Sequence, residues 1–285
     1  MPKIKIDFFH IGFHKTASTY LQKVYFPSIN NLEILNNLSP DIDKWFIENF
    51  VNIEDANFDR DFFLRNFEKK LQDYSNTKSN IIGISEENLS GNVYTGERSN
   101  ELMLRIYNTF GKTKILIVIR NQLDYILSSY SNFIYHKGEK NFESWLKGND
   151  LQKKMIAKLK YSRFIFEYRK IFGEKNVIVL TYENLFSSNG IKDFLSSYNL
   201  SGASVKDRKI NIGSSIFGNH ILLLLNKIGV PMISGRQQFR SVFPEFGDDR
   251  SRLRNLLGEA CDELVQDNKT LSERLELNLP QEYFF

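Results

Sequence analysis

The chain has 285 residues, of which 41% are hydrophobic, 14% aromatic and 25% charged, and this balance excludes a disordered chain or a fibrous repeat. Its formal net charge is +4, an excess too small for sequence-independent nucleic-acid binding. The single cysteine, Cys261, excludes an internal disulfide framework and a metal site built from several thiolates of one chain.

The N-terminal segment, residues 1–9, has apolar residues interrupted by Lys5 and Asp7, which is unlike a secretion signal. No apolar run approaches the roughly 18 residues that a membrane span needs. We therefore expect a cytoplasmic protein without a transmembrane segment. Peripheral contact with a membrane stays open.

Four short segments rich in branched apolar residues predict buried strands, at residues 4–11, 81–85, 115–119 and 177–181. Amphipathic spacing predicts helices over residues 59–74, 151–172, 187–198 and 248–274. The segments 30–57 and 201–249 are the least regular and are expected to form loops or lids. Strands that alternate with helices favour an α/β three-layer sandwich around a mostly parallel sheet, and no composition break divides residues 1–285 into more than one domain.

The first predicted strand runs into the sequence G-F-H-K-T-A-S-T at positions 12–19. A strand that turns through a short loop into a helix aims free backbone N–H groups at one point, which suits a phosphate. Lys15 adds a positive charge there, and Thr16, Ser18 and Thr19 add hydroxyl donors. The alternative to a phosphate site is an ordinary N-capped helix whose lysine is solvated and binds no ligand.

This loop lacks the glycine spacing of nucleotide-triphosphate loops, because Phe9 and His14 stand where G-x-x-x-x-G-K-[ST] has glycine. It resembles instead the 5′-phosphosulfate-binding loop of sulfotransferases that use 3′-phosphoadenosine-5′-phosphosulfate (PAPS), in its bacterial form. The resemblance implies the P-loop NTPase-like sulfotransferase fold, with His14 to Thr19 around the phosphate. Ala17 departs from the family, which usually has glycine at that position.

A second motif follows the strand at 115–119, where Arg120 stands at the strand end and Ser128 lies in the helix after it. An arginine fork and a hydroxyl together bind a terminal phosphate well, and ligands of parallel sheets bind beyond the carboxyl ends of the strands. The pair resembles the family's 3′-phosphate motif. Either residue alone would read as an ordinary surface side chain.

Weaker matches add further cofactor contacts. The strand ending in Tyr-Glu-Asn-Leu at 182–185 is similar to a family segment, and this implies that Tyr161 contacts the adenine and Tyr20 stacks on it. Both tyrosines would serve equally well as core residues. Arg208 and Lys209 resemble a late basic loop that closes over the 3′-phosphate, with a solvated turn as the alternative.

Two carboxylates, Glu86 and Glu87, follow the strand at 81–85 and are candidates for the base that sulfuryl transfer to a hydroxyl requires. Glu87 fits the family pattern by its place before Asn-Leu-Ser, and neighbouring residues of an extended segment face opposite ways. Glu86 and His136 remain alternatives for this role.

These motifs predict a PAPS-dependent sulfotransferase that acts on an acceptor hydroxyl of a small molecule or glycan, with a carbohydrate or cell-surface glycan favoured by the resemblance. Lys15 and Glu87 are the predicted catalytic residues, and no metal is expected. A P-loop kinase-like phosphotransferase and a non-catalytic nucleotide-binding protein of the same fold are the alternatives. The sequence does not indicate the oligomeric state.

Overall fold

The computed structural model describes residues 5–72, 81–185, 190–198, 200, 216–227 and 248–284. The chain divides into two compact units. The first comprises Met1–Ile119 and Arg163–Lys206, and the second comprises Arg120–Ser162 and Asp207–Phe285. The single domain expected from the sequence stays a prediction.

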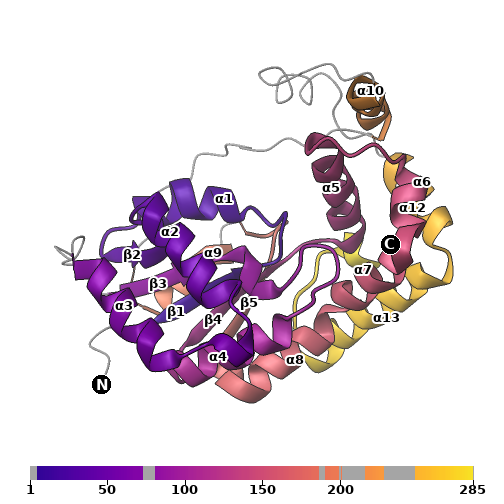
Figure 1. Cartoon of the computed structure of the whole chain (residues 1–285). Helices are drawn as coiled ribbons and strands as arrows, with labels where there is room; N and C mark the ends of the chain where they lie inside the picture. The colour runs from indigo at the N-terminus through magenta and orange to yellow at the C-terminus, as the bar shows by residue number, and fades with distance from the viewer. Residues whose placement is uncertain are drawn as a thin grey trace. The chain divides into compact units, whose positions relative to one another are not determined.

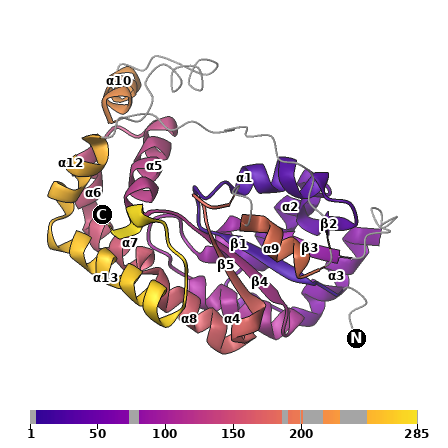
Figure 2. The same cartoon turned by 180° about the vertical axis from the view of Figure 1, so that it is seen from behind.

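A sheet of five parallel strands forms the centre of the first unit (Figures 1 and 2). Its strands are β1 (Phe8–Gly12), β2 (Leu32–Ile34), β3 (Ile81–Ser85), β4 (Lys114–Ile119) and β5 (Val177–Thr181). They lie in the order β2-β3-β1-β4-β5, so that β1 is central and pairs with both β3 and β4. The predicted α/β class with a mostly parallel sheet is confirmed.

The helical elements of the first unit are mostly short. They are α1 (Ser18–Tyr20), η1 (Leu21–Tyr25), η2 (Phe26–Ser28), η3 (Leu35–Asn37), α2 (Pro40–Phe46), η4 (Ile47–Val51), η5 (Asp55–Asn57), α3 (Arg60–Gln72), η6 (Glu87–Ser90), α4 (Ser99–Phe110), α8 (Tyr161–Phe172, nearly all of it in this unit), η8 (Glu174–Asn176) and α9 (Gly190–Ser196).

Those of the second unit are α5 (Gln122–Tyr135), α6 (Phe142–Lys147), η7 (Gly148–Asp150), α7 (Leu151–Leu159), α10 (Ile216–Lys227), α12 (Asp248–Leu257), α13 (Glu259–Arg274) and η9 (Gln281–Phe284).

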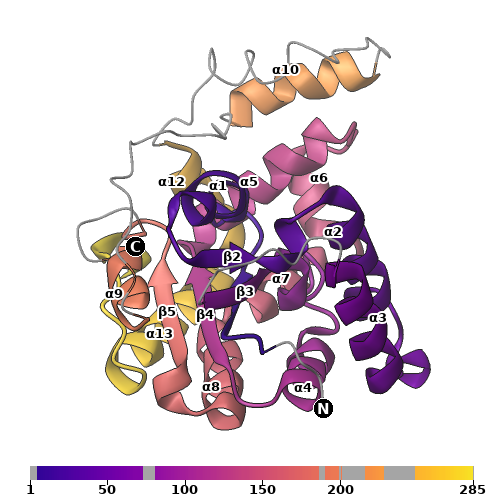
Figure 3. The same cartoon turned by 90° about the vertical axis from the view of Figure 1, so that its left-hand side faces the viewer.

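Alternating strand residues bury apolar side chains on both faces of the sheet. Phe8 of β1 packs in one core with the helical segment that begins at α1 and with α9. Figure 3 shows α9 beside β5 at this side of the sheet. On the other face, Phe9 packs against Phe110 of α4, and Phe13 packs against Phe164 of α8. Helices on both faces give the three layers that the alternating pattern predicts.

Two of the predicted long helices are wrong as single elements. The helix expected over 151–172 breaks at Lys160, whose backbone leaves the helical region, and Asp267 of α13 accepts hydrogen bonds from the backbone N–H and hydroxyl of Ser162. The helix expected over 248–274 breaks at Gly258, which has a φ of 54° and separates α12 from α13.

The segment expected to be irregular at 30–57 is also more regular than its sequence indicates. It contains β2 at the edge of the sheet and α2, which is capped by the Ser39 hydroxyl accepting from the N–H of Ile42. Its mixed polar composition hid a three-residue strand, because a strand this short shows no clear alternation.

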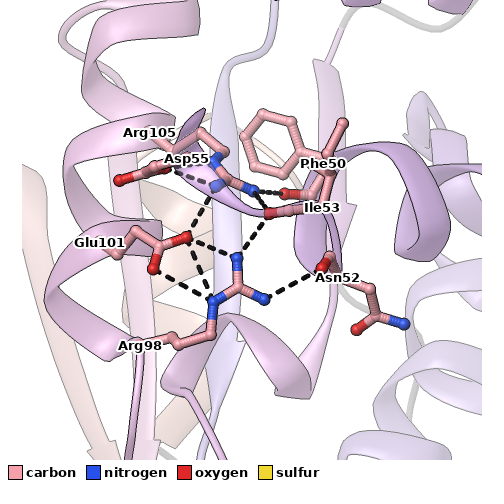
Figure 4. Close-up of polar contacts among 7 residues, drawn as sticks. All are labelled: Phe50, Asn52, Ile53, Asp55, Arg98, Glu101 and Arg105. Atoms are coloured by element: carbon pink, nitrogen blue, oxygen red, sulfur yellow. Dashed lines mark hydrogen bonds and ion pairs between the residues drawn. The ribbon is translucent and has the colours of Figure 1, made fainter. Parts of the chain in front are cut away.

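An arginine clamp fastens the end of that segment to α4 (Figure 4). Arg105 is almost fully buried, pairs with Asp55 and Glu101, and donates to the carbonyls of Phe50 and Ile53. Each backbone acceptor is thereby satisfied by a charged donor, which fixes the segment on α4. Because α4 also packs against η6, the clamp supports the segment that follows β3.

Among the residues described, no helix is both long and apolar enough to cross a membrane.

Candidate functional site

The loop after β1 makes a tight turn that is held by its own hydrogen bonds. Lys15 and Ala17 both have left-handed backbone conformations, with φ of 68° and 66°. The buried Thr16 hydroxyl donates to the carbonyl of Phe13 and so ties the loop across its base. Tyr20 N–H donates to the Ala17 carbonyl at 2.9 Å, and the helical segment begins there.

The side chains of this loop alternate in exposure. His14, Thr16, Ser18 and Tyr20 are buried, whereas Lys15, Ala17 and Thr19 are partly exposed. The predicted ligands of the 5′-phosphate lie in this one loop, and Lys15, Ala17 and Thr19 are the members that are partly open to solvent. Tyr20 packs in one core cluster with residues of α9, and its predicted stacking on adenine stays a prediction.

Gly12 faces a cradle of polar atoms. A Cβ placed on Gly12 would lie 2.5 Å from Ser18 Oγ, 3.0 Å from Thr16 Oγ1 and 3.2 Å from His10 Nε2. Ser18 Oγ and His10 Nε2 are buried and have no hydrogen-bond partner among the residues that the structure describes. Buried polar atoms of this kind call for a hydrogen-bonding partner such as a water or a ligand oxygen, and the short distances mean that only glycine fits at position 12.

Left-handed backbone at Ala17 predicts a stabilising substitution. Ala17→Gly should raise the free energy of unfolding by about 0.5–1 kcal/mol, because a Cβ disfavours this conformation by more than glycine loses in entropy. Urea unfolding measures it, with the exposed helical residue Ala157 as the control, where Ala157→Gly should be destabilising. A loss of stability in Ala17→Gly would contradict the strained loop described here.

The two carboxylates after β3 have different surroundings. The carboxylate of Glu86 is buried and accepts from the N–H of Asn88 at 2.8 Å and from its side-chain amide at 2.6 Å. The amide oxygen of Asn88 lies 3.2 Å from His14 Nε2, so these bonds connect η6 to the loop after β1. Glu87 is half-buried at the first position of η6, so its side chain is more accessible than that of Glu86.

Burial raises the pKa of Glu86 from its ordinary 4.5 to about 7, with smaller contributions from Asp43 and Glu87. A raised pKa favours the protonated form in the folded state, so the group's contribution to stability is complete below pH 4.5 and is lost as the pH rises through 7. The titration of Glu86 should therefore lower the wild-type free energy of unfolding by about 3 kcal/mol between pH 4.5 and pH values above 7.

Glu86→Gln removes this titration but keeps a side-chain oxygen at the same place, which can still accept hydrogen bonds from Asn88. The variant should therefore gain stability over wild type at pH 8 and show little gain at pH 4.5, both measured by urea unfolding. An equal difference between the two proteins at both pH values would contradict a buried, titrating Glu86.

The second phosphate motif lies in the second unit. Asn121 caps α5 by accepting from the N–H groups of Leu123 and Asp124, and its amide donates to the Glu282 carbonyl at 2.6 Å. The Tyr161 hydroxyl donates to the carbonyl of Arg120 at 2.9 Å. These bonds fix the carbonyl of Arg120 and the start of α5 that follows it.

The predicted residues of this motif differ in exposure. Arg120 and Ser128 are half-buried, whereas Tyr161 is fully buried. Tyr161 thus supports the backbone of Arg120, and its predicted contact with adenine stays a prediction. Arg208 and Lys209 lie outside the described residues. His136 follows the last turn of α5 and is exposed.

The sequence motifs did not indicate that His10 of β1 lies next to the loop as part of the candidate site. His10 Nδ1 lies 2.7 Å from the hydroxyl of Ser85, its partner in the β1–β3 register. The signal available was a histidine inside an otherwise apolar strand. Within the described part of the chain, no cluster of three or more His, Cys, Asp or Glu side chains could hold a metal ion.

Comparison with solved structures identifies the architecture. A sulfotransferase from Alicyclobacillus acidocaldarius superposes with a TM-score of 0.51 at 15% identity, over 97% of this chain and 98% of that one. The chain has the sulfotransferase fold. No protein-family model and no curated protein sequence matches it.

Two further solved structures are more distant. The sulfotransferase domain from the curacin biosynthetic pathway has a TM-score of 0.42 at 12% identity, over 97% of this chain and 99% of that one. Retinol dehydratase in complex with androsterone and the inactive cofactor PAP has a TM-score of 0.37 at 12% identity, over 98% of this chain and 84% of that one. Both likenesses are too distant to carry a functional argument.

Proposed function

We propose that this protein is a sulfotransferase that moves a sulfuryl group from PAPS to an acceptor hydroxyl. The observation that carries the proposal is the polar cluster at the end of β1, next to the loop that carries Lys15. There Ser18 Oγ and His10 Nε2 are buried close to Gly12 and have no hydrogen-bond partner in the described part of the chain. The shared fold with the Alicyclobacillus sulfotransferase supports it, as do the two motifs of the sequence.

In this proposal the loop binds the 5′-phosphosulfate end of the cofactor. Thr16, Ser18 and Thr19 supply hydroxyl donors, His14 and Ala17 supply loop backbone, and Tyr20 stacks on the adenine. Arg120 and Ser128 bind the 3′-phosphate, with Tyr161 near the adenine and Arg208 and Lys209 closing over the phosphate. When bound, PAPS supplies an activated sulfuryl group whose transfer leaves adenosine 3′,5′-bisphosphate (PAP).

The two catalytic roles follow from charge. Glu87 accepts the proton of the acceptor hydroxyl, which makes that oxygen a nucleophile toward sulfur. Lys15 stabilises the negative charge that develops on the phosphate oxygen when the old S–O bond breaks. No step requires a metal. Positioning and charge stabilisation account for the catalysis, as they do in phosphoryl transfer.

We propose a carbohydrate hydroxyl, such as one on a cell-surface glycan, as the acceptor. The family resemblance of the loop supports this choice, and a small-molecule hydroxyl is the other possible outcome. A screen of sugars, oligosaccharides and small alcohols with ³⁵S-labelled PAPS tests it, because only a true acceptor gains the label. Transfer to non-sugar acceptors alone would overturn the carbohydrate assignment.

A ligand panel separates sulfotransferase from its alternatives. PAP at 100 times its Kd should stabilise the protein by about 2.7 kcal/mol, seen as a rise in melting temperature, whereas ATP with Mg²⁺ should have little effect. Stabilisation by ATP and Mg²⁺ instead of PAP would favour a phosphotransferase. Stabilisation by PAP without label transfer to any acceptor would favour a non-catalytic binding protein.

A further inference from the structure

A chain of hydrogen bonds connects η6 to the loop after β1. The backbone N–H and the side-chain amide of Asn88 both donate to Oε1 of the buried Glu86 carboxylate, at 2.8 and 2.6 Å. The amide nitrogen is thereby committed to Glu86, and the amide oxygen lies 3.2 Å from His14 Nε2. Because an amide oxygen can only accept, Nε2 is the ring nitrogen that carries a proton and donates.

A backbone bond joins the same two segments. The N–H of Glu86 donates to the carbonyl of His10 in β1 at 3.1 Å, so residues 10 and 14 are both bonded to the segment that follows β3. The loop keeps its own shape through internal bonds, such as that of the Thr16 hydroxyl to a backbone carbonyl of the loop. The bond between Asn88 and His14 therefore fixes where this loop lies relative to η6.

The bonded residues are chain neighbours of the two predicted catalytic side chains. Lys15 follows His14 directly and has a left-handed backbone, with a φ of 68°. Glu87 stands between Glu86 and Asn88, at the first position of η6. The same chain of bonds therefore connects the backbone that carries Lys15 to the backbone that carries Glu87. Reacting groups need such support, because a displacement of about 1 Å can cost a hundredfold in rate.

We propose that Asn88 is a positioning residue: through His14 it holds the loop that carries Lys15 in a fixed place relative to the turn that carries Glu87. This inference rests on the proposed function, in which these two residues act on opposite sides of the transferred sulfuryl group. The internal bonds of the loop persist without Asn88, so the link acts on the transfer step and not on cofactor binding. Glu86 contributes by orienting the Asn88 amide.

Substitutions at both ends of this hydrogen bond test the role. Asn88→Leu keeps a side chain of similar size but removes the donor and the acceptor. His14→Asn loses the reach of Nε2, whereas His14→Gln places an amide N–H near the position of Nε2. The matched control is Asn66→Leu, because Asn66 is also half-buried and its amide donates to the carbonyl of Phe62, but it lies on α3.

Turnover is measured as ³⁵S transfer to the acceptor found in the screen, and the Kd of PAP by titration calorimetry. We expect Asn88→Leu and His14→Asn each to lower turnover by about 10–10²-fold and to leave the Kd of PAP within about threefold of wild type. His14→Gln should recover most of the loss. The double variant His14→Asn/Asn88→Leu should be no slower than the slower single variant, since both changes remove the same bond. Asn66→Leu should stay within about twofold of wild type.

Wild-type turnover in Asn88→Leu, losses that multiply in the double variant, or a PAP affinity that falls as far as turnover would overturn the inference. If Asn88→Leu does not fold, His14→Asn and nitrogen NMR of wild type decide. At pH 8, where an imidazole is ordinarily neutral, the His14 proton should lie on Nε2, and a proton on Nδ1 would overturn the inference. A wild type that transfers no label would instead overturn the proposed function and this inference with it, so the two failures are distinguishable.

Discussion

Lys15→Ala should lower turnover by about 10²–10³-fold while the protein remains folded. Lys15 is the partly exposed cation of the loop, and residues 12–19 contain no other lysine and no arginine. Removing it leaves the loop donors in place but takes away the charge that balances the departing phosphate oxygen. Turnover is measured as ³⁵S transfer to the acceptor found in the screen.

The matched control for this change is Lys23→Ala. Lys23 is an exposed lysine of η1 that takes no part in the loop, so its removal should leave turnover within about twofold of wild type, as is usual for surface substitutions. Lys15→Arg keeps the charge but replaces a compact ammonium by a planar fork, and intermediate activity is expected. Near-normal turnover in Lys15→Ala would remove Lys15 from the mechanism.

Glu87→Gln should lower turnover by about 10²–10⁴-fold, the range for loss of a general base, with little change in the Kd of PAP. The amide has the size of the carboxylate but cannot accept the proton of the acceptor hydroxyl. The comparison variant is Glu86→Gln. It changes the adjacent carboxylate, which is buried and accepts two hydrogen bonds from Asn88.

The two variants together assign the base. A large loss of turnover in Glu87→Gln with a smaller one in Glu86→Gln supports Glu87. The opposite order would assign proton transfer to Glu86, whose pKa of about 7 suits a base near neutral pH. Wild-type turnover in both would place the base elsewhere, with His136 as the next candidate.

The central sheet was predictable because its strands are nearly continuous apolar runs. The predicted strand at 177–181 coincides with β5, and the predicted strands at 81–85 and 115–119 agree with β3 and β4 to within one residue. β2 was not predictable, since three residues at a sheet edge carry too little pattern. The break at Lys160 depends on Asp267, which is more than a hundred residues away in sequence.

The candidate site, like the fold, was predictable from the sequence only in part. The loop at 12–19 is contiguous, so its residue types and spacing revealed it directly. The unlike environments of Glu86 and Glu87 could not be read from two adjacent glutamates, because burial depends on how η6 packs. The contact of His10 with Ser85, its partner across the sheet 75 residues later, follows only from the strand register.

The most direct test of the account compares two nucleotides on two proteins. Calorimetric titrations of wild type and Arg120→Ala with PAP and with adenosine 5′-monophosphate isolate the contribution of the 3′-phosphate. We predict that wild type binds PAP at least about tenfold more tightly than the monophosphate, and that Arg120→Ala loses this preference while binding the monophosphate as before. Equal affinity of wild type for both nucleotides, or an unchanged preference in Arg120→Ala, would contradict the assignment of a PAPS-type cofactor to these residues.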